Sequence, residues 1–566
     1  MPSHDLDDVS LLSREVGPLP VVQHFFERLG VEELLHTYVP ERRLGRQPVV
    51  RNSKALTVMV ANILTSREPL YAVPGWLARR VAEHTGLSED QVSLMNDDRI
   101  GRALDRLYRT DPASLMTALV VRAVKEFHID LSQVHCDTTT VTFSGAYGGQ
   151  RDKEQRQRPP LITFGHNKDH RPDLKQLVYC LTVSADGAVP VHYKLYDGST
   201  SDDNTHIETW TTIRKIAGRA DFTYVGDSKL CSRDNMGYIA KEGGVFVTVL
   251  PRSRREHETF CVYVQDHAIP WQEVRREKDG EGDKPDRVHE AFESLERSAE
   301  GYRVIWYRSS VKRAIDERRR GDRIARSKMR IEKLEQRRGA HRFRTVESAQ
   351  KAAEQALQEE GAQDWLKVQI REASVKDFKQ TTPGRPGKDT KYRRVDIPLL
   401  LFEVAELPDA IRADAKCDGL FAMVTNHEQL SPTELLAVYK YQPFLEKRNE
   451  QLKSVLAVAP VFLKNPERVA ALLFLYFIAV LVFALIEREA RQQMERHGLD
   501  TIPLYPEQRP CKAPTCDGIL QAFEGLRKNQ LLDSKGTVLR TFFDPMSRVA
   551  RQLLKLLHVD GKPFGV

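Results

Sequence analysis

Residues 134–143 read Val-His-Cys-Asp-Thr-Thr-Thr-Val-Thr-Phe, a run dominated by β-branched and aromatic side chains. Such residues favour a pleated, half-buried strand, so this run predicts a β-strand. Asp137 lies in its middle, although Asp is disfavoured in strands because its short side chain competes for backbone hydrogen bonds. The acid therefore marks a candidate functional position, with a solvent-facing place on an edge strand as the ordinary alternative.

A second acid ends another short strand. Residues 222–229 read Phe-Thr-Tyr-Val-Gly-Asp-Ser-Lys, in which an apolar run stops at Gly226 and Asp227. An Asp at such a place is often only a turn residue or a helix N-cap. Nearby, residues 205–216 have a helical pattern and Asp186-Gly187 suits a hairpin turn. These patterns predict an α/β core whose strands are 133–143, 177–184, 189–196, 222–226 and 244–250.

A third acid lies on a predicted helix. From Tyr439 to Lys453 the sequence follows Tyr-x2-Gln-x3-Glu-x6-Lys, in which the glutamine is Gln442 and the acid is Glu446. Seven residues are about two helical turns, so we expect Glu446 and Lys453 to project from one face. A carboxylate able to hold a metal would then lie beside a cation able to hold a phosphate. The ordinary alternative is a solvated stripe of charge.

The start of this helical region also has a recognisable signal. Ser431 suits an N-cap, with Pro432 in the first turn and Glu434 completing a capping box. Pro443 falls inside the region, so it either kinks one helix or begins a second helix with Glu446 in its first turn.

The order strand-Asp, strand-Asp, helix-Glu resembles the DDE transposases of bacterial insertion sequences, in particular the IS-four-type superfamily with its Tyr-Arg-Glu-Lys signature. The chain matches that signature at Tyr439, Glu446 and Lys453 and departs from it at Gln442, where the family has Arg. The resemblance covers roughly residues 130 to 520. Further blocks similar to the family are Gly165 with Asp169, Arg171, Pro172, Asp173 and Gln176; Asp186-Gly187; Gly198 with Asp202; Gly226-Asp227 with Asn235; and residues 457–491.

The resemblance implies an α/β fold with an RNase H-like catalytic core, a mixed sheet flanked by helices. A large insertion is expected to interrupt this core, and the 219 residues between Asp227 and Glu446 leave room for it. The expected domains are a helical N-terminal domain for DNA-end binding at 1–125, the first part of the core at 126–250, the insertion at 251–410, the second part of the core at 411–500, and a C-terminal region for dimerisation at 501–566.

Within the expected insertion, strand-like pieces at 260–264 and 302–307 alternate with charged helices. Trp306 and Tyr307 could stack on an unpaired base at a DNA end, although packing within a sheet is the more ordinary role. In the C-terminal region we expect one amphipathic helix near 549–557.

The same resemblance implies two-metal phosphoryl transfer on DNA. Asp137, Asp227 and Glu446 would be the catalytic acids and would hold two Mg²⁺ ions, with Mn²⁺ as a substitute, because these hard cations prefer oxygen ligands. Asp137 would bridge both ions, and each of the other two acids would complete one site.

The DNA contacts implied by the family begin with Tyr439 and Lys453, which would touch phosphates at the transposon end. Gln442 would be a third DNA contact at the position of the family's Arg, but it lacks that residue's charge and bidentate grip, so Arg448 is a further candidate for the role. The expected activity is cut-and-paste transposition at terminal inverted repeats, by a homodimer on paired ends that also binds target DNA, in the bacterial cytoplasm at the nucleoid. The alternatives are a DNA-binding remnant without cleavage and an RNase H-fold nuclease without strand transfer.

The charge distribution agrees with a nucleic-acid partner. The 566 residues carry a net charge of +7, too mild to decide, and their number predicts several domains. Residues 312–344, however, contain fourteen Lys or Arg and only five Asp or Glu. Such a patch suits phosphate backbones, although a solvated charged helix is an equal alternative. The candidate contacts in this patch are Arg318, Arg319, Arg320 and Arg323.

Two features bear on the cellular setting. Seven scattered cysteines without a paired Cys-x2-Cys pattern argue against zinc, and their odd number predicts a reducing cytosol. The first eight residues are polar and acidic, so we expect no secretory signal.

Residues 469–486 are eighteen residues without a charge, by length a minimal membrane-spanning candidate. We expect a buried core helix instead, and no membrane partner, because the related transposases place a core helix here.

Overall fold

The computed structural model describes residues 9–41, 47–145, 147, 158–168, 171–200, 205–278, 285–335, 343, 345–456, 458 and 463–566. The chain divides into two compact units. The first unit comprises Met1–Thr248 with Ala437–Val566, and the second unit is Val249–Leu436. The family blocks at Asp169, Asp202 and residue 457 lie outside the described residues. All three candidate acids belong to the first unit.

The first unit contains a mixed sheet whose strands follow the order β4-β3-β2-β5-β6. Strand β3 is antiparallel to both β2 and β4, whereas β5 is parallel to both β2 and β6. The prediction of an α/β core with a mixed sheet is therefore confirmed. The strands are β2 (Gln133–Phe143), β3 (Lys175–Ser184), β4 (Pro190–Asp197), β5 (Thr223–Gly226) and β6 (Val245–Val249), with α8 (His206–Ala217) before β5 and α9 (Arg233–Lys241) before β6.

The turn between β3 and β4 follows the predicted Asp186-Gly187 signal. The backbone N–H of Ser184 donates to the carbonyl of Val189 at 2.9 Å, which closes the hairpin. Gly187 has φ of 79°, in the left-handed region where a side chain is strained. A Cβ at Gly187 would also lie 2.9 Å from the side chain of Arg488. Glycine is thus required here both by backbone conformation and by close packing.

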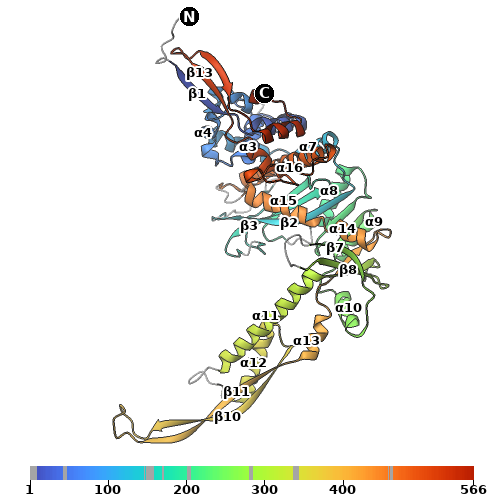
Figure 1. Cartoon of the computed structure of the whole chain (residues 1–566), viewed down its shortest axis with the longest axis vertical. Helices are drawn as coiled ribbons and strands as arrows, with labels where there is room; N and C mark the ends of the chain where they lie inside the picture. The colour runs from blue at the N-terminus through green and yellow to red at the C-terminus, as the bar shows by residue number, and fades with distance from the viewer. Residues whose placement is uncertain are drawn as a thin grey trace. The chain divides into compact units, whose positions relative to one another are not determined.

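Helices dominate the N-terminal part of the first unit, but a strand precedes them. Strand β1 (Ser10–Glu15) pairs antiparallel with β13 (Arg527–Leu532), which in turn pairs with β14 (Val538–Phe543). The two ends of the described chain therefore share a small sheet (Figure 1). The helices are α1 (Leu19–Leu29), α2 (Val31–Tyr38), α3 (Asn52–Thr65), α4 (Val73–Ala78), α5 (Glu89–Val92), α6 (Asp97–Tyr108) and α7 (Pro112–Phe127).

The uncharged run at 469–486 forms the centre of α16 (Pro466–Arg496). In the described part of the chain this is the one helix long and apolar enough to cross a membrane, and 94% of its most apolar window is buried inside the structure. An apolar helix enclosed on all sides is typical of a large core. The expectation of a buried helix is confirmed. Two shorter helices follow it, α17 (Cys516–Gln521) and α18 (Arg548–Leu556), and α18 matches the predicted amphipathic helix.

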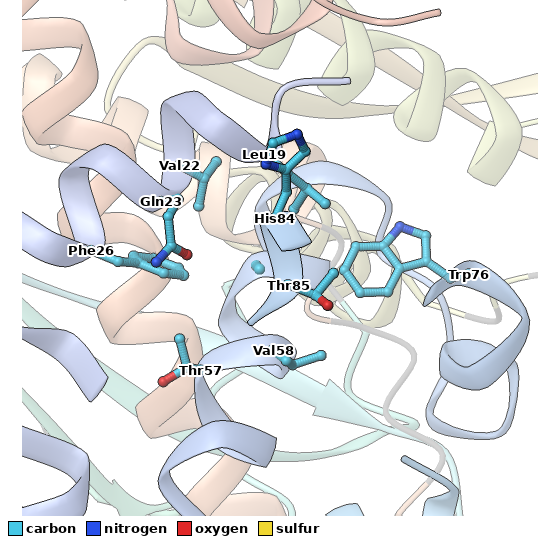
Figure 2. Close-up of a pocket in the computed structure, with 10 residues that line it drawn as sticks. Leu19, Val22, Gln23, Phe26, Thr57, Val58, Trp76, His84 and Thr85 are labelled. Atoms are coloured by element: carbon cyan, nitrogen blue, oxygen red, sulfur yellow. The ribbon is translucent and has the colours of Figure 1, made fainter. Parts of the chain in front are cut away.

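A small cavity lies among the N-terminal helices (Figure 2). Its volume is about 10 Å³, and Leu19, Phe26, Thr57 and Trp76 are among its lining residues. A single water molecule needs a space of about 10–15 Å³. The cavity is therefore a packing defect and too small for a substrate.

The second unit contains four antiparallel strands in the order β12-β9-β8-β7 and a separate long hairpin, β10–β11. The hairpin base packs against α11 and α12 in one hydrophobic cluster. The elements are α10 (Arg255–Asp266), β7 (Gln272–Glu277), β8 (Arg287–Glu293), β9 (Arg303–Ser309), α11 (Ser310–Glu335), α12 (Val346–Glu360), β10 (Leu366–Gln380), β11 (Tyr392–Glu406), α13 (Pro408–Ala415), β12 (Leu420–Thr425) and α14 (Pro432–Tyr439).

Two expectations for this region have opposite outcomes. The strand at 302–307 corresponds to β9, but the expected strand at 260–264 is wrong, since these residues lie in helix α10. Phe260 and Val264 are buried one helical turn apart while Val262 between them is 56% exposed. Helical spacing of the buried side chains thus overrides the β propensity of the run.

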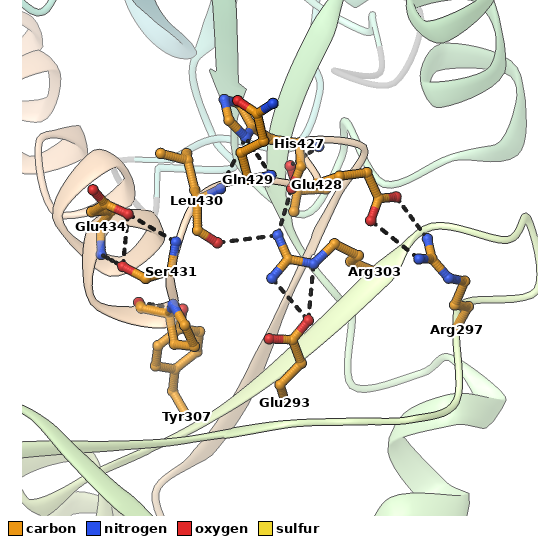
Figure 3. A network of polar contacts seen from close by, with 12 residues as sticks. Glu293, Arg297, Arg303, Tyr307, His427, Glu428, Gln429, Leu430, Ser431 and Glu434 are labelled. Atoms are coloured by element: carbon orange, nitrogen blue, oxygen red, sulfur yellow. Dashed lines mark hydrogen bonds and ion pairs between the residues drawn. The ribbon is translucent and has the colours of Figure 1, made fainter.

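Figure 3 shows how the segment before α14 is fixed within the second unit. The guanidinium of Arg303 donates to Glu293 at 2.9 Å and to the carbonyls of His427 and Leu430 at 2.5 and 3.1 Å. Ser431 and Glu434 form the predicted capping box: the Ser431 N–H donates to Glu434 at 2.9 Å, and the Glu434 N–H donates to the Ser431 hydroxyl at 3.3 Å.

Candidate active site

Asp137 lies on β2, and Asp227 directly follows the last residue of the neighbouring parallel strand β5. In the pairing of these strands Cys136 is level with Gly226, so each acid comes one residue after the last paired position. Neighbouring strands are about 4.8 Å apart, and residues at one register of parallel strands point to the same face. Both side chains are half-buried. Two acids far apart in the sequence therefore form one acidic site.

The backbone around Asp227 is held from both sides. The hydroxyl of Thr248, on β6, donates to the Asp227 carbonyl at 2.6 Å, and the backbone N–H of Lys229 donates to the Asp227 carboxylate at 3.0 Å. At Gly226, a Cβ would lie 3.1 Å from the Leu230 side chain and 3.3 Å from His206. This close packing explains the glycine before the acid and fixes where the carboxylate emerges.

Helix α15 (Gln442–Glu450) covers β2 at the level of Asp137. At its start, the Gln442 side chain donates to the carbonyl of Cys136 at 3.4 Å and is 2.9 Å from the ring of His135. Near its end, the Asn449 amide donates to the Asp137 carboxylate at 3.4 Å. Glu446 is four residues after Gln442 and three before Asn449, so it lies at the border of the helix face that meets β2, with its side chain exposed.

Tyr439 lies within electrostatic reach of all three acids. Burial first, and then the negative charges of Asp227, Glu446 and Asp137, together raise the pKa of Tyr439 to about 12. A phenol responds to a carboxylate in this way when the two are near each other. Tyr439 is half-buried at the end of α14, in the neighbourhood of the two aspartates and of Glu446.

Asp137 itself is an unusual carboxyl group. Its pKa is raised to about 6, chiefly by burial and in smaller part by the charge of Asp227, while the ammonium of Lys168 acts in the opposite direction. Its side chain is only 19% exposed. A buried carboxylate beside a second carboxylate favours a positive charge in its neighbourhood.

Lys168 provides one such charge. Its ammonium donates to the carbonyl and hydroxyl of Thr138 at 2.6 and 2.8 Å and lies 3.4 Å from the Asp137 carboxylate. No local pattern predicts this contact, because Lys168 is thirty-one residues away from Asp137 on an irregular segment. Asn449 was also not predicted, although its helical spacing from Glu446 could have suggested it.

The segment that carries Lys168 is packed tightly against the sheet. The Gln176 amide donates to the carbonyls of Gly198 and His166 at 2.7 and 3.2 Å. A Cβ at Gly165 would lie 1.9 Å from the carbonyl oxygen of Gly198, and a Cβ at Gly198 would lie 2.1 Å from that of Gln176. The glycines thus permit a backbone approach that sets the position of Lys168.

In the described part of the chain no three His, Cys, Asp or Glu side chains lie close enough together to hold a metal ion. The donor chemistry nevertheless fits Mg²⁺ or Mn²⁺, which prefer carboxylate oxygens. Asp137 and Asp227 are neighbours whose like charges disfavour each other, as the raised pKa of Asp137 shows. Glu446 is exposed on the covering helix. The residues present therefore suit a divalent cation, which Asp137 and Asp227 would hold together with Glu446.

Lys453 does not follow the predicted straight helix. Pro443 begins a second helix, as one of the two alternatives proposed, but α15 then passes into a π-helical turn at Gln451–Val455. The N–H of Leu456 donates to the carbonyl of Gln451 at 2.8 Å, an i to i+5 bond. The expected straight α-helix from Glu446 to Lys453 is therefore wrong, because Lys453 lies in the π turn, which is wider than an α turn.

Two predicted DNA contacts beside the acids are instead used inside the first unit. Gln442 is 5% exposed and holds α15 on β2, as described above. Arg448 is 3% exposed and pairs with the carboxylate of Glu487 at 2.6 Å. It also donates to the carbonyls of Ala188 and Gly187 at 3.0 and 2.9 Å. These positions do not support a role for either side chain at a phosphate.

The basic residues predicted on α11 separate into two kinds. Arg320 is 7% exposed and pairs with Asp414 and Asp418 at 2.7 and 2.5 Å, so its position does not support a DNA contact. The other three remain candidates because they are exposed: Arg318, Arg319 and Arg323. Trp306 and Tyr307 are 2% and 0% exposed, which favours packing over base stacking.

The chain has limited similarity to known proteins. Residues 12–121 match a family described as a domain of unknown function, DUF4277. A comparison with curated protein sequences gives no match. Among solved structures, it is similar to the piggyBac transposase synaptic complex with hairpin DNA, at 13% identity and a TM-score of 0.27, over 49% of this chain and 58% of that one.

Two further solved structures are similar to the chain. The Mos1 mariner paired end complex with Mn matches at 11% identity and a TM-score of 0.14, over 39% of this chain and 65% of that one. The Mos1 strand transfer complex matches at 12% identity and a TM-score of 0.14, over 37% of this chain and 61% of that one. The chain thus spans about three fifths of each of these structures, and its function has to be inferred from its own site.

Proposed function

We propose that this chain is a DDE transposase of the IS-four type, with an RNase H-like core that cleaves DNA at terminal inverted repeats and joins the ends to target DNA. One observation carries the proposal: Asp137 on β2 and Asp227 directly after the parallel strand β5 are neighbours, and helix α15, which carries Glu446, is anchored to Asp137 through Asn449. Carboxylates from these three segments are suited to hold the metal ions of two-metal phosphoryl transfer.

Asp137, Asp227 and Glu446 would hold two Mg²⁺ ions, or Mn²⁺ in their place, which when bound activate a nucleophilic oxygen and stabilise the leaving oxygen at phosphorus. The chain's own residues prepare this site. Burial and the neighbouring carboxylate make Asp137 poor at carrying its charge alone, so it favours a cation. Asn449 orients its carboxylate from the covering helix.

Lys168 and Tyr439 complete the site as polar groups near the acids. The Lys168 ammonium is held by Thr138 beside Asp137, where it offsets part of the negative charge. Tyr439 keeps its proton at neutral pH because its pKa is raised to about 12, so its hydroxyl can donate to a phosphate oxygen. We assign both residues to the positioning of the DNA strand, together with Lys453.

The partners follow from this reaction. The substrate is double-stranded DNA that carries a terminal inverted repeat, and the second substrate is target DNA. A homodimer would hold two paired ends, and the protein would act in the bacterial cytoplasm at the nucleoid. The exposed arginines of α11, at 318, 319 and 323, are candidate phosphate contacts.

The test is cleavage of end-labelled DNA that contains the flanking inverted repeat, with Mg²⁺ or Mn²⁺, by the wild type and by Glu446→Gln. The matched control is Glu450→Gln, an exposed residue on the same helix that is not among the carboxylates acting on Tyr439. We expect metal-dependent cleavage at the repeat boundary by the wild type and the control, and a loss of at least about a thousandfold in Glu446→Gln.

Equal cleavage by Glu446→Gln would contradict the assignment of the third acid. Binding of the repeat without cleavage by any of the three proteins would favour a DNA-binding remnant. Cleavage without joining to a target would favour a nuclease.

A further inference from the structure

The distal part of the β10–β11 hairpin extends beyond the core of the second unit (Figure 1). The two strands pair without interruption from Leu366 with Glu406 to Gln380 with Tyr392. The hydrophobic cluster on α11 and α12 takes up only the hairpin base, and no residue from 371 to 399 belongs to it. At about 3.3 Å per residue, the strand beyond the cluster is roughly 30 Å long. This ribbon is built without a protein core beneath it.

The end of this ribbon is strongly basic. Residues 379–394 contain six Lys or Arg and one Asp, a local net charge of +5. All six basic side chains are exposed, and within the described residues none of them pairs with a carboxylate. We call this set the ribbon tip; it consists of Lys379, Arg385, Lys388, Lys391, Arg393 and Arg394.

The cross-strand register concentrates the charge further. Lys379 lies directly opposite Arg393, and like charges in that position destabilise a strand pair. A two-stranded hairpin without a core beneath it is only marginally stable in water. The repulsion between the facing cations therefore lowers a stability that is already small. Both costs are offset when an anionic partner lies along the ribbon.

Exposed aromatic side chains lie among these charges. Phe378 and Tyr392 are 65% and 51% exposed, and their positions alternate with Lys379 and Arg393 along the two strands. One face of the ribbon therefore presents rings and the other presents paired cations. Cations that contact phosphates and rings that contact base edges or methyl groups are the combination found at protein–DNA interfaces.

We propose that the ribbon tip binds double-stranded DNA by entering its major groove. The major groove is about 12 Å wide and admits a two-stranded ribbon as it stands, whereas the minor groove, about 6 Å wide, is entered by strands in proteins that bend or kink the duplex. The inference rests on the proposed function for the identity of the partner, and it deepens that function by assigning a second DNA contact outside the unit that carries the acids.

The experiment measures binding of the full chain to a fluorescent 30-base-pair duplex over a series of salt concentrations. The test variant is Lys379→Gln/Arg393→Gln. The matched control is Lys367→Gln/Arg371→Gln, which removes two exposed charges from the base of the same hairpin, where Arg371 already lies 3.5 Å from Glu403. Both variants also enter the cleavage assay described above.

We expect the test variant to bind about tenfold more weakly near physiological salt, and its plot of log affinity against log salt to be less steep by about 2, since each lost phosphate contact removes about 0.9. The control should match the wild type. Equal affinity and slope for wild type and test variant would overturn the proposal. A changed oligomeric state of the DNA-free test variant, with DNA binding intact, would also overturn it and identify the tip as a contact between copies.

The two proposals fail separately. If the wild type cleaves the repeat while the test variant binds normally, only the ribbon assignment is wrong. If no protein cleaves but the test variant binds DNA more weakly, the ribbon contact stands without the transposase activity. A wild type that binds no duplex would reject both.

Discussion

The first unit and the ribbon tip use arginine in opposite ways. Arg448 is buried beside α16, where its guanidinium is shared between Glu487 and two backbone carbonyls. Arg393, on the hairpin, is exposed and lies opposite another cation. A buried, fully bonded arginine stabilises the fold, whereas an exposed arginine among like charges has surface available for a ligand. The number of positive charges in a segment is thus a weaker guide to DNA binding than the burial and the ion pairing of its basic side chains.

The largest effect expected from this difference is on stability. Arg448→Ala should lower the free energy of unfolding by about 3–5 kcal/mol, because the buried Glu487 carboxylate loses its partner. Arg393→Ala, the same substitution on the exposed ribbon, should change it by less than about 0.5 kcal/mol. Denaturant unfolding of the two variants measures both values. A similar loss in both would remove the distinction between the regions.

The next prediction concerns acid sensitivity. Burial lowers the pKa of His192, on β4, to about 4, below the ordinary value of 6.5. The unfolded chain therefore takes up a proton before the folded chain does, and stability falls as the pH drops from 6.5 towards 4, by about 1.4 kcal/mol per pH unit at most. In the second unit, a hydrogen bond from Arg254 lowers the pKa of Glu256 to about 2. The stability that Glu256 contributes is therefore lost as the pH falls from 4.5 to 2.

Hydrogen exchange followed separately in the two units over this pH range tests the sign and order of these losses. The first unit should lose protection at the higher pH. His192→Gln should weaken the pH dependence of the first unit between pH 6.5 and 4, and part of it should remain because burial also lowers the pKa of His135 to about 4. The pH dependence of the second unit should stay unchanged. A second unit that loses protection first would contradict the assignment.

Replacement of the Asp137 carboxylate should affect the free energy of unfolding in the opposite direction from replacement of Arg448. Asp137→Asn should raise the free energy of unfolding by about 1 kcal/mol near neutral pH, because it removes a carboxylate that is buried beside Asp227. The same variant should lose cleavage. Thermal unfolding without divalent cations, with Asn449→Ala as a control for the helix contact, makes the comparison. A destabilised Asp137→Asn would indicate a structural role for this acid.

The smallest expected effect lies on the ribbon itself. Arg393→Gln removes one of two like charges in a cross-strand pair and should stabilise the hairpin by about 0.2–1 kcal/mol in the absence of DNA. Amide exchange of β10 and β11 should slow slightly while DNA binding weakens. Faster exchange would show that the facing cations are not a cost to the free protein.

The sequence anticipated the strands that carry the two aspartates with good accuracy. The run at 133–143 coincides with β2, and 222–226 differs from β5 by one residue at its start. Strong β propensity and a turn signal after each run made these elements evident. The capping box at Ser431 and the buried helix at 469–486 were predicted equally well, because both depend on the local order of residue types.

Contacts between distant segments could not be predicted from the sequence. Nothing local distinguishes Arg448 from an exposed arginine, since its burial depends on Glu487 and on the turn at Gly187. Lys168 reaches Asp137 only through the close approach of Gly165 and Gly198. The π turn at Gln451–Val455 likewise breaks a helical spacing that the sequence alone favoured. The assignment of catalytic roles to the three acids remains a prediction.

The small sheet of β1, β13 and β14 has a consequence for how the chain is made. Strand β1 emerges first from the ribosome, but its partner β13 begins at residue 527. At about 5–20 residues per second, β1 waits roughly half a minute to nearly two minutes for that partner. Helix α15 is also synthesised long after β2. The first unit is therefore completed only after β13 has been made, long after both aspartates have left the ribosome.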